Sequence, residues 1–318
     1  MSPVPSDRGS IGLKRVAVLL NAGSGTGTAQ ESEARIRELF GEAGIGVEVT
    51  LAGDAAEFDR ALTGAIESAA DAIVAGGGDG TISTVAHALA DHDIPLGVLP
   101  LGTLNHFAKD LGIPDDLEAA VRVVLAGHTM RVDVGEVNGR VFLNNSSLGL
   151  YATIVRLREQ HAARGFRKWI VAAWATAVEL RRFRLLLVGV DVDGKRTRHR
   201  TPLVLVGNNR YKMEGVQAGT RDSLREGELA LYIVKARSRW QLLLLVWKIF
   251  RGRAEEAEEL EMLRVEQARI EARGRHQRVA LDGEVTVMEG PLEYRVRPTA
   301  LRVFVPAAEA VAAASQVA

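Results

Sequence analysis

The chain has 318 residues, long for one hydrophobic core and comfortable for two domains. The absence of cysteine excludes disulfides and thiolate metal sites, and the lack of about 18 uninterrupted apolar residues argues against a membrane-spanning helix. The net charge of zero conceals an asymmetry. Residues 1–150 carry 10 basic and 20 acidic side chains, whereas residues 151–318 carry 30 and 20. This predicts two units with different partners, the basic one suited to nucleic acid, an anionic membrane or a phosphorylated ligand.

The first part of the chain alternates short apolar runs with longer segments of mixed polarity. Residues 1–12 form a leader without the apolar core of a secretory signal. The predicted strands then cover residues 15–20, 47–51, 71–75 and 95–100, and the predicted helices cover 29–43, 55–69 and 82–89. Strands and helices that alternate at this spacing predict a parallel sheet with helices on its faces.

A glycine-rich stretch, Gly76-Gly-Gly-Asp-Gly-Thr81, joins the third predicted strand to the helix that follows it. The N-terminus of a helix favours an anion, because its first backbone amides and its dipole point toward the ligand. Glycines let the backbone approach a phosphate without a clash at Cβ. Asp79 is the exception, since a carboxylate repels phosphate. Its presence indicates that it holds a metal ion or orders the loop.

Two further loops follow predicted strand ends. The first contains Gly23 and Gly25 but lacks the third glycine of the dinucleotide fingerprint, and no Walker A loop occurs in the chain. In the second, Gly102 and Thr103 can present a backbone amide and a hydroxyl to a ligand, and Asn105 is predicted to cap a helix. A purely structural role as turn and cap residues explains the second loop equally well.

From about residue 130 the pattern changes to antiparallel β structure. The pairs Asn138-Gly139, Asp193-Gly194 and Asp282-Gly283 are typical of tight turns between paired strands. We expect strands over residues 132–137, 141–149, 185–193, 202–207, 228–234, 263–272, 278–287, 292–297 and 300–305, with a helical stretch over 151–184. The predicted domains are residues 13–130 and 131–299, and residues 300–306 are expected to return to the first.

Two segments of the second half combine tryptophan with basic residues. Residues 239–253 are apolar on nearly all sides, contain Trp240 and Trp247, and are bordered by arginines. Trp169 and Trp174 lie in the predicted helical stretch, which also has arginines at both ends. This composition is typical of an interfacial contact with a membrane. Two core helices with charged ends explain it equally well.

Four motifs occur in an order that matches a known family: Asn21–Gly25, Gly77–Thr81, residues 99–108 and Asp282–Glu284. In these motifs the chain resembles the catalytic domain of the diacylglycerol kinase family, and within it the soluble bacterial lipid kinases. It is also similar to sphingosine and ceramide kinases and, more distantly, to NAD kinases. The resemblance implies a Rossmann-like nucleotide-binding α/β domain followed by an antiparallel β-sandwich domain with helices, with the active site between the two.

The resemblance also implies roles for individual residues. Asp79 would join a network linked to Mg²⁺ around the phosphates of ATP, and Glu284 with Asp282 would supply the general base that accepts the proton of the attacking hydroxyl. The sequence does not decide between these two carboxylates, and an isolated Asp-Gly is also an ordinary turn. The residues expected around the nucleotide are Asn21, Ala22, Gly23, Ser24, Gly25, Thr50, Gly77, Gly78, Asp79, Gly80, Thr81, Ile82, Ser83, Thr84, Gly102 and Thr103.

Two positions depart from the family pattern. Ser83 and Thr84 stand where the family often has Asn and Glu, which weakens the prediction that they contact the nucleotide. A second, structural Mg²⁺ site of bacterial members corresponds here to Ser223, Glu226 and Glu228. Glu226 replaces an aspartate and Arg225 adds positive charge, and both changes disfavour a hard cation that prefers a cluster of oxygen ligands.

The resemblance therefore predicts a lipid kinase that uses ATP and Mg²⁺ to phosphorylate a hydroxyl of diacylglycerol or a related lipid. We expect it in the cytoplasm at the inner membrane surface, in peripheral contact with anionic lipid and with no nucleic-acid partner. A homodimer formed through strand edges remains open, as does the identity of the acceptor. Two alternatives are a soluble small-molecule kinase similar to NAD kinase, and a catalytically silent regulator that binds nucleotide or lipid.

Overall fold

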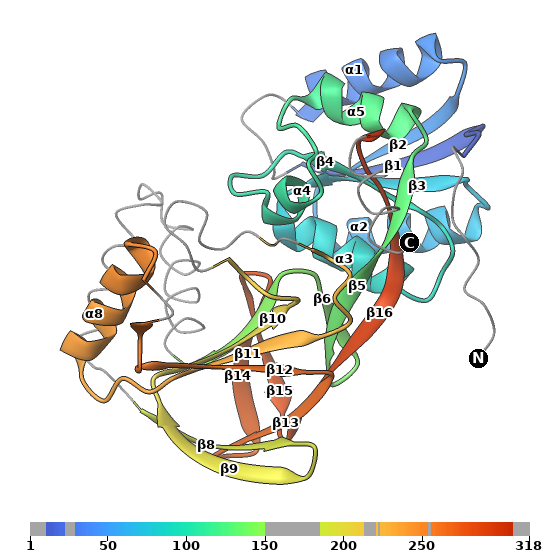
Figure 1. Cartoon of the computed structure of the whole chain (residues 1–318). Coiled ribbons are helices and arrows are strands. Elements are labelled where there is room, and N and C mark those ends of the chain that lie inside the picture. Colours follow the sequence, from blue (N-terminus) through green and yellow to red (C-terminus); the bar gives the residue numbers. More distant parts are fainter. Residues whose placement is uncertain are drawn as a thin grey trace, which may run out of the picture. The chain divides into compact units, whose positions relative to one another are not determined.

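The computed structural model describes residues 11–22, 29–149, 185–212, 221, 223–253 and 256–307 (Figure 1). The chain divides into two units, one of residues 1–132 with 299–318 and one of residues 133–298. We call them unit 1 and unit 2 and describe each by itself. The predicted domain borders lie after residue 130 and before residue 300. The structure divides the chain after Val132 and before Thr299. The predicted helical stretch over 151–184, with Trp169 and Trp174, lies outside the described residues.

Unit 1 is built on a parallel sheet in the strand order β2-β1-β3-β4-β16. Its central strands β1 and β3 are apolar runs that are buried along almost their whole length, as expected for strands covered on both faces. The strands are β1 (Arg15–Asn21), β2 (Gly46–Ala52), β3 (Ala72–Gly77), β4 (Leu96–Pro100) and the end of β16 (Leu292–Phe304). The helices are α1 (Ala29–Glu42), α2 (Ala55–Glu67), α3 (Asp79–Leu89), α4 (His106–Asp110) and α5 (Leu117–Leu125).

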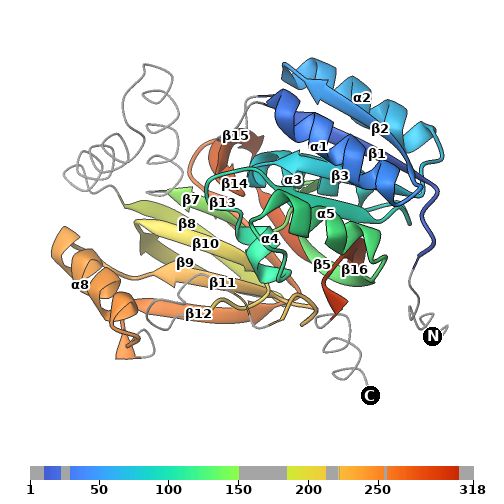
Figure 2. The ribbon, with the colours of Figure 1, turned by 90° about the horizontal axis from the view of Figure 1, so that it is seen from above.

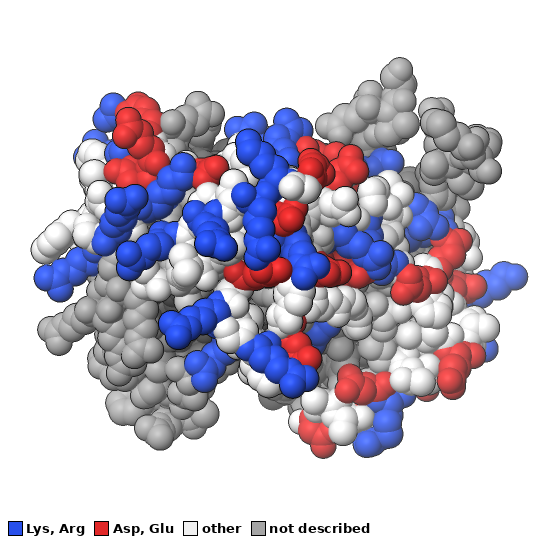
Figure 3. All heavy atoms as spheres, turned by 90° about the horizontal axis from the view of Figure 1, so that it is seen from below, with Lys and Arg blue, Asp and Glu red and all other residues white. Residues whose placement is uncertain are grey.

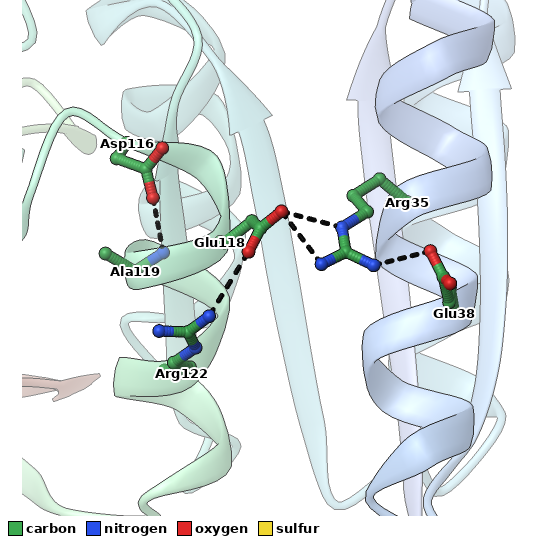
Figure 4. A network of polar contacts seen from close by, with 6 residues as sticks. All are labelled: Arg35, Glu38, Asp116, Glu118, Ala119 and Arg122. Carbon is green, nitrogen blue, oxygen red and sulfur yellow. Dashed lines mark hydrogen bonds and ion pairs between the residues drawn. The ribbon is translucent and has the colours of Figure 1, made fainter.

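Helices α1 and α5 cover one face of this sheet, and α2 and α3 cover the other (Figure 1). An ion pair joins the first two helices, because Glu118 on α5 lies 2.8 Å from Arg35 on α1 and also pairs with Arg122 (Figure 4). The sequence predicted a helix start at Asn105, which α4 follows, but it did not predict α5. The start of α5 carries a helix signal all the same, since the Asp116 side chain accepts a hydrogen bond from the Ala119 amide at 2.8 Å.

Unit 2 contains two antiparallel sheets. One has the order β12-β11-β10-β7-β14-β15, and the other combines β9, β8, β13 and the start of β16 with β5 and β6. The strands are β5 (Thr129–Val137), β6 (Arg140–Phe142), β7 (Asn145–Gly149), β8 (Leu186–Val192), β9 (Lys195–Thr201), β10 (Leu203–Asn208), β11 (Leu229–Val234), β12 (Leu260–Val265), β13 (Gln267–Ala272), β14 (His276–Leu281) and β15 (Glu284–Glu289), with helix α8 (Arg239–Phe250) after β11 (Figure 2).

The core of unit 2 draws buried apolar side chains from both sheets. Leu148, Val206 and Leu231 come from one sheet, and Val190 and Ile270 come from the other. Side chains that meet from two sheets in one core define a β-sandwich. The predicted fold class, a Rossmann-like α/β domain followed by an antiparallel sandwich with helices, is therefore confirmed.

The three predicted two-residue turns all form. Asn138, Asp193 and Asp282 have positive φ angles of 46°, 51° and 47°. The glycine after each is also positive, at 81°, 77° and 87° in chain order. Positive φ at both central residues is the type I′ geometry, whose twist matches that of the paired strands. These turns join β5 to β6, β8 to β9 and β14 to β15.

Several predicted strand limits are wrong. The segment 263–272 is divided into β12 and β13 at Glu266, and 278–287 is divided by the Asp282-Gly283 turn. The predicted strands 292–297 and 300–305 are one strand, β16, which continues through Pro298. Thr299, the residue at which the chain passes from unit 2 to unit 1, has a positive φ of 52°. Strand β9 was not among the predicted strands, because its sequence is mostly charged and lacks apolar residues. Charged residues are common in edge strands, and β9 lies at the edge of its sheet.

Candidate active site

Three loops of unit 1 come together at the carboxyl ends of β1, β3 and β4. The Asn21 side-chain amide donates to the Thr81 hydroxyl at 3.2 Å and so joins the first loop to the second. Asp79 accepts from the Phe107 amide at 3.4 Å and joins the second loop to the third. Strand β1 lies between β2 and β3, so the strand order reverses here. Open α/β sheets bind ligands at such a reversal, outside the carboxyl ends of the strands.

Glycine is required where the second and third loops touch. A Cβ on Gly102 would lie 2.5 Å from the Cα of Gly78 and 2.7 Å from the Asn105 side-chain oxygen. The Leu101 amide also donates to the Gly77 carbonyl at 3.1 Å. The two backbones are therefore in direct contact, and any side chain at position 102 would separate them.

Helix α3 presents an uncapped N-terminus to this cluster. The helix begins at Asp79, three residues earlier than predicted, after Gly78 in an extended conformation. No side chain of the described residues caps it, and the Ile82 amide makes the first helical bond, to Gly78, at 3.1 Å. The amides of Gly80 and Thr81 in the first turn have no carbonyl four residues earlier within the helix. Such a terminus fits the phosphate of a nucleotide.

Asn105 does not cap helix α4 as predicted. It precedes the helix, but its backbone is left-handed with φ of 51° and its side chain makes no capping bond. The side chain instead accepts from the Gly102 amide at 3.0 Å and donates to the Pro100 carbonyl at 3.1 Å. Asn105 therefore closes the loop that carries Gly102 and Thr103.

The remaining residues expected around the nucleotide lie in different environments. Thr50 is half-buried in β2, and the amide of Ala22 donates to the Ala52 carbonyl at 3.0 Å. Ile82 is buried, Ser83 is half-buried, and Thr103 is exposed. Thr84 is exposed, and its hydroxyl donates to the Gly80 carbonyl within the helix. Gly23, Ser24 and Gly25 lie outside the described residues.

In unit 2, Asp282 holds a neighbouring turn through its carboxylate. One oxygen accepts the amide of Leu143 at 2.8 Å, and the other accepts the amides of Asn144 and Asn145 at 2.7 and 3.0 Å. The residue is buried, and its own amide donates to the Asn145 carbonyl at 2.9 Å. Both carboxylate oxygens are thus committed to backbone donors, which makes Asp282 an anchor for residues 143–145.

Two residues that the sequence reading missed support the same turn. The Arg221 guanidinium is buried and donates to the Leu143 carbonyl at 2.6 Å and to the Asn144 side chain at 3.0 Å. The Asn208 side-chain amide donates to the Leu143 carbonyl at 3.0 Å. These contacts join residues 65 to 78 positions apart, and no sequence motif signals them.

Glu284 follows Asp282 across the turn and has a different environment. It is classed as an exposed residue. The surrounding protein nevertheless partly desolvates the carboxylate, and this is the main cause that raises its pKa. The negative charge of Asp282 raises the pKa further, whereas Arg140 lowers it. A reachable carboxylate with a raised pKa suits proton transfer near neutral pH.

The residues of the predicted structural Mg²⁺ loop do not fit such a site. Glu228 pairs with the Arg264 guanidinium, and the Ser223 hydroxyl accepts the amide of Arg225 at 3.1 Å. Burial raises the pKa of Glu226, which disfavours its charged form. Among the residues that the structure describes, no group of three acidic or histidine side chains is arranged to hold a metal ion. We therefore derive no step from a second Mg²⁺.

Two family models match consecutive parts of the chain. The diacylglycerol kinase catalytic domain matches residues 15–137, and the YegS C-terminal NAD kinase beta sandwich-like domain matches residues 147–305. The chain belongs to this family of lipid kinases. The resemblance inferred from the four motifs is thereby confirmed, and the matched segments include all of them.

Individual relatives agree with this membership. A diacylglycerol kinase of Mycobacterium tuberculosis (strain ATCC 25618 / H37Rv) is 29% identical over 307 residues, which cover 92% of this chain and 96% of the relative. One of Bacillus subtilis (strain 168) is 39% identical over 142 residues, 42% of this chain and 45% of the relative. The crystal structure of a Bacillus anthracis str. Sterne diacylglycerol kinase has a TM-score of 0.69 at 20% identity, covers 93% and 98% of the two chains, and shares the fold.

Proposed function

We propose that this protein is an ATP-dependent kinase that transfers the γ-phosphate to a hydroxyl of diacylglycerol or a related lipid. The observation that carries the proposal is the uncapped N-terminus of α3, enclosed by loops that touch at Gly78 and Gly102. Such a site suits phosphate groups and needs no basic side chain. Membership of a lipid kinase family supports the choice of acceptor.

The loops of unit 1 supply the positioning that phosphoryl transfer requires. This reaction depends on alignment and on neutralisation of charge more than on covalent chemistry by the protein. The Asn21–Thr81 and Asp79–Phe107 hydrogen bonds keep the three loops in one arrangement. A bound Mg²⁺ would neutralise the phosphate oxygens, with the carboxylate of Asp79 as a candidate ligand. One or two carboxylates suffice for Mg²⁺, because phosphates and waters complete its coordination.

The turn of unit 2 supplies the acceptor side of the proposed reaction. Glu284 takes the proton of the attacking lipid hydroxyl, since it is the exposed carboxylate with the raised pKa. Asp282 does not act as the base in this proposal. It positions Glu284 by holding the type I′ turn against residues 143–145.

The experiment is transfer of labelled phosphate from ATP to diacylglycerol in mixed micelles with Mg²⁺. We expect Asp79→Ala to abolish transfer, while Asp59→Ala, at an exposed position on α2, keeps the wild-type rate. Full activity of the Asp79 variant would refute the assignment of the site. Transfer to NAD and to no lipid would instead indicate the small-molecule kinase. Nucleotide binding without transfer to any acceptor would indicate a silent regulator.

A lipid acceptor also has consequences for location. The proposal has the protein working in the cytoplasm at the inner membrane surface, because its acceptor resides in the bilayer. Within the described ranges, no helix has the length and apolar composition of a membrane span, which agrees with peripheral contact. A homodimer remains a prediction, to be tested by sedimentation at several protein concentrations.

A further inference from the structure

Helix α8 of unit 2 carries two apolar stripes on opposite sides. Leu242 and Leu245 are buried and pack with the strand residues Val234 and Leu260. The opposite side has the helical spacing i, i+3, i+4, i+7 and consists of Trp240, Leu243, Leu244 and Trp247. These four side chains are 69%, 41%, 44% and 46% exposed. One stripe therefore fixes the helix to its unit, and the other presents two tryptophans and two leucines to solvent.

Arginines accompany the exposed stripe at both ends. The Arg239 guanidinium lies 5.5 Å from the ring of Trp240, and the Arg251 guanidinium lies 4.9 Å from the ring of Trp247. An apolar stripe with tryptophan and bordering arginines is the composition of a helix that lies in a membrane interface. With 12 residues the helix is too short to cross a bilayer, which takes about 20. It suits a position parallel to the surface.

A pocket lined mainly by basic residues lies at the start of this helix. It has a volume of about 640 Å³ and is lined by Arg198, Arg200, Lys235 and Arg237, with His199 and two apolar residues. Ligand pockets usually span about 300–1,000 Å³. The helix begins directly after the pocket wall, because Ser238 is its N-cap residue. The pocket and the exposed stripe are therefore neighbours within one unit.

The positive charge of the pocket is largely uncompensated. Lys235 pairs with Glu261 at 3.2 Å, and His199 lies 3.8 Å from the same carboxylate. The guanidinium groups of Arg198, Arg200 and Arg237 make no ion pair with any described residue. Figure 3, seen from the side where β8 and β9 lie in Figure 1, shows many basic side chains gathered on that face. Of the four Lys and Arg residues that line the pocket, only Lys235 pairs with a carboxylate among the described residues.

We propose that the pocket binds the phosphate-bearing headgroup of an anionic phospholipid while the exposed stripe of α8 enters the membrane interface. Guanidinium groups recognise phosphate oxygens through paired hydrogen bonds, and an anionic leaflet attracts clustered basic residues. The apolar stripe would be unsuited to a soluble phosphate ligand, whereas a headgroup with acyl chains satisfies both features at once. The inference deepens the proposed function, since it names the surface from which a lipid kinase would take its acceptor.

Vesicle flotation of the full chain tests this proposal. The vesicles contain phosphatidylcholine alone or with 30 mol% phosphatidylglycerol, and neither ATP nor diacylglycerol is needed. We expect Arg198→Gln with Arg200→Gln to lower binding to the anionic vesicles by about 10- to 30-fold and to change binding to the neutral ones little. Trp240→Ala with Trp247→Ala should lower binding to both.

Matched controls separate the pocket from general charge and general apolarity. Lys195→Gln with Arg273→Gln removes two exposed charges elsewhere in unit 2, and Val287→Ala shortens an exposed apolar side chain on β15. Both controls should bind nearly as wild type. Equal losses in the charge control and the pocket variant would overturn the pocket, and unchanged binding of the tryptophan variant would overturn the docking helix. Circular dichroism checks that every variant is folded.

Two further outcomes have defined meanings. Release from anionic vesicles by inorganic phosphate, at the concentration of lipid phosphate, would assign the pocket to a soluble phosphate and overturn the headgroup assignment. We expect no release. Transfer to a water-soluble short-chain diacylglycerol, measured in parallel, tests the proposed function separately. Activity on that acceptor without vesicle binding would refute only the docking surface, whereas vesicle binding without activity on any acceptor would refute only the kinase proposal.

Discussion

Replacing Asp282 by Asn should destabilise unit 2, whereas replacing Glu284 by Gln should not. The two carboxylates are two residues apart in one turn, and each change removes one negative charge at nearly constant volume. Asp282 receives three backbone amides from residues 143–145, and Glu284 is exposed. The two substitutions therefore distinguish the anchoring role of Asp282 from the proposed role of Glu284 as the base.

The magnitude follows from the hydrogen bonds. An asparagine keeps one oxygen, so at least one of the amides of Leu143, Asn144 and Asn145 would face an amide group that cannot accept its proton. A hydrogen bond to a charged group contributes about 1.5–3 kcal/mol, and an unsatisfied buried donor costs about 1–3 kcal/mol. We expect a loss of about 3 kcal/mol, a large part of a domain's 5–15 kcal/mol. For a unit of this size the midpoint of thermal unfolding should fall by about 6–12 °C.

We expect the Glu284→Gln substitution to have the opposite effect on stability. Desolvation by the surrounding protein raises the pKa of Glu284, so the folded state binds its proton more tightly than the unfolded state does. Stability then falls as pH rises from the unfolded pKa through the raised folded pKa. At neutral pH the glutamine removes this penalty. The variant should be as stable as wild type or slightly more stable, yet inactive.

Tryptophan fluorescence during urea unfolding measures this selectively. Residues 1–132 and 299–318 contain no tryptophan, so the signal comes from residues 133–298. With a slope of about 2 kcal/mol per molar urea, Asp282→Asn should lower the midpoint by roughly 1.5 M. A wild-type midpoint for Asp282→Asn together with lost activity would refute the anchor role. Equal destabilisation by both changes would refute the distinction between the two carboxylates.

The other predictions concern the pH dependence and the glycine contacts. In the pH profile of kcat/KM, the rise on the acid side should occur above the ordinary glutamate pKa of about 4.3, because Glu284 must lose its proton to act as the proposed base. Arg140→Gln should move this rise to still higher pH, because it removes a positive charge that lowers the pKa of Glu284. Gly102→Ala should slow transfer by about 10²-fold, because the new Cβ would lie 2.5 Å from the Cα of Gly78 and displace the loops. Gly64→Ala, on helix α2 with nothing within 4 Å of the new Cβ, should instead stabilise unit 1 by about 0.5–1 kcal/mol, as thermal unfolding would measure.

The features that the sequence predicted well depend on neighbouring residues. A type I′ turn needs only two residues that tolerate positive φ, so the turns at Asn138-Gly139 and Asp193-Gly194 can be predicted from the sequence. The glycine-rich turn before α3 is local in the same way. Its loops also converge predictably, since parallel strands place their carboxyl ends at one edge of the sheet.

The features that it predicted poorly depend on distant partners. Asn105 is a residue type that often caps helices, but here its backbone is left-handed and its side chain bonds to Gly102 and Pro100. The anchoring role of Asp282 arises from amides 137 to 139 positions away, and nothing near Asp282 in the sequence indicates them. The sequence predicted separate strands over 292–297 and 300–305, yet β16 continues through Pro298 and Thr299, where φ is positive.

The return of β16 to unit 1 has a consequence for synthesis of the protein. Strand β4 receives its outer neighbour only when Val303 pairs with Leu96, about 200 residues later. At about 5–20 residues per second, the ribosome needs roughly 10–40 s to make that segment. Until then the outer edge of β4 offers unpaired backbone groups to other nascent chains. A shortened gene for residues 1–132 would carry this defect permanently, so an isolated unit 1 should be built with residues 299–307 joined to it.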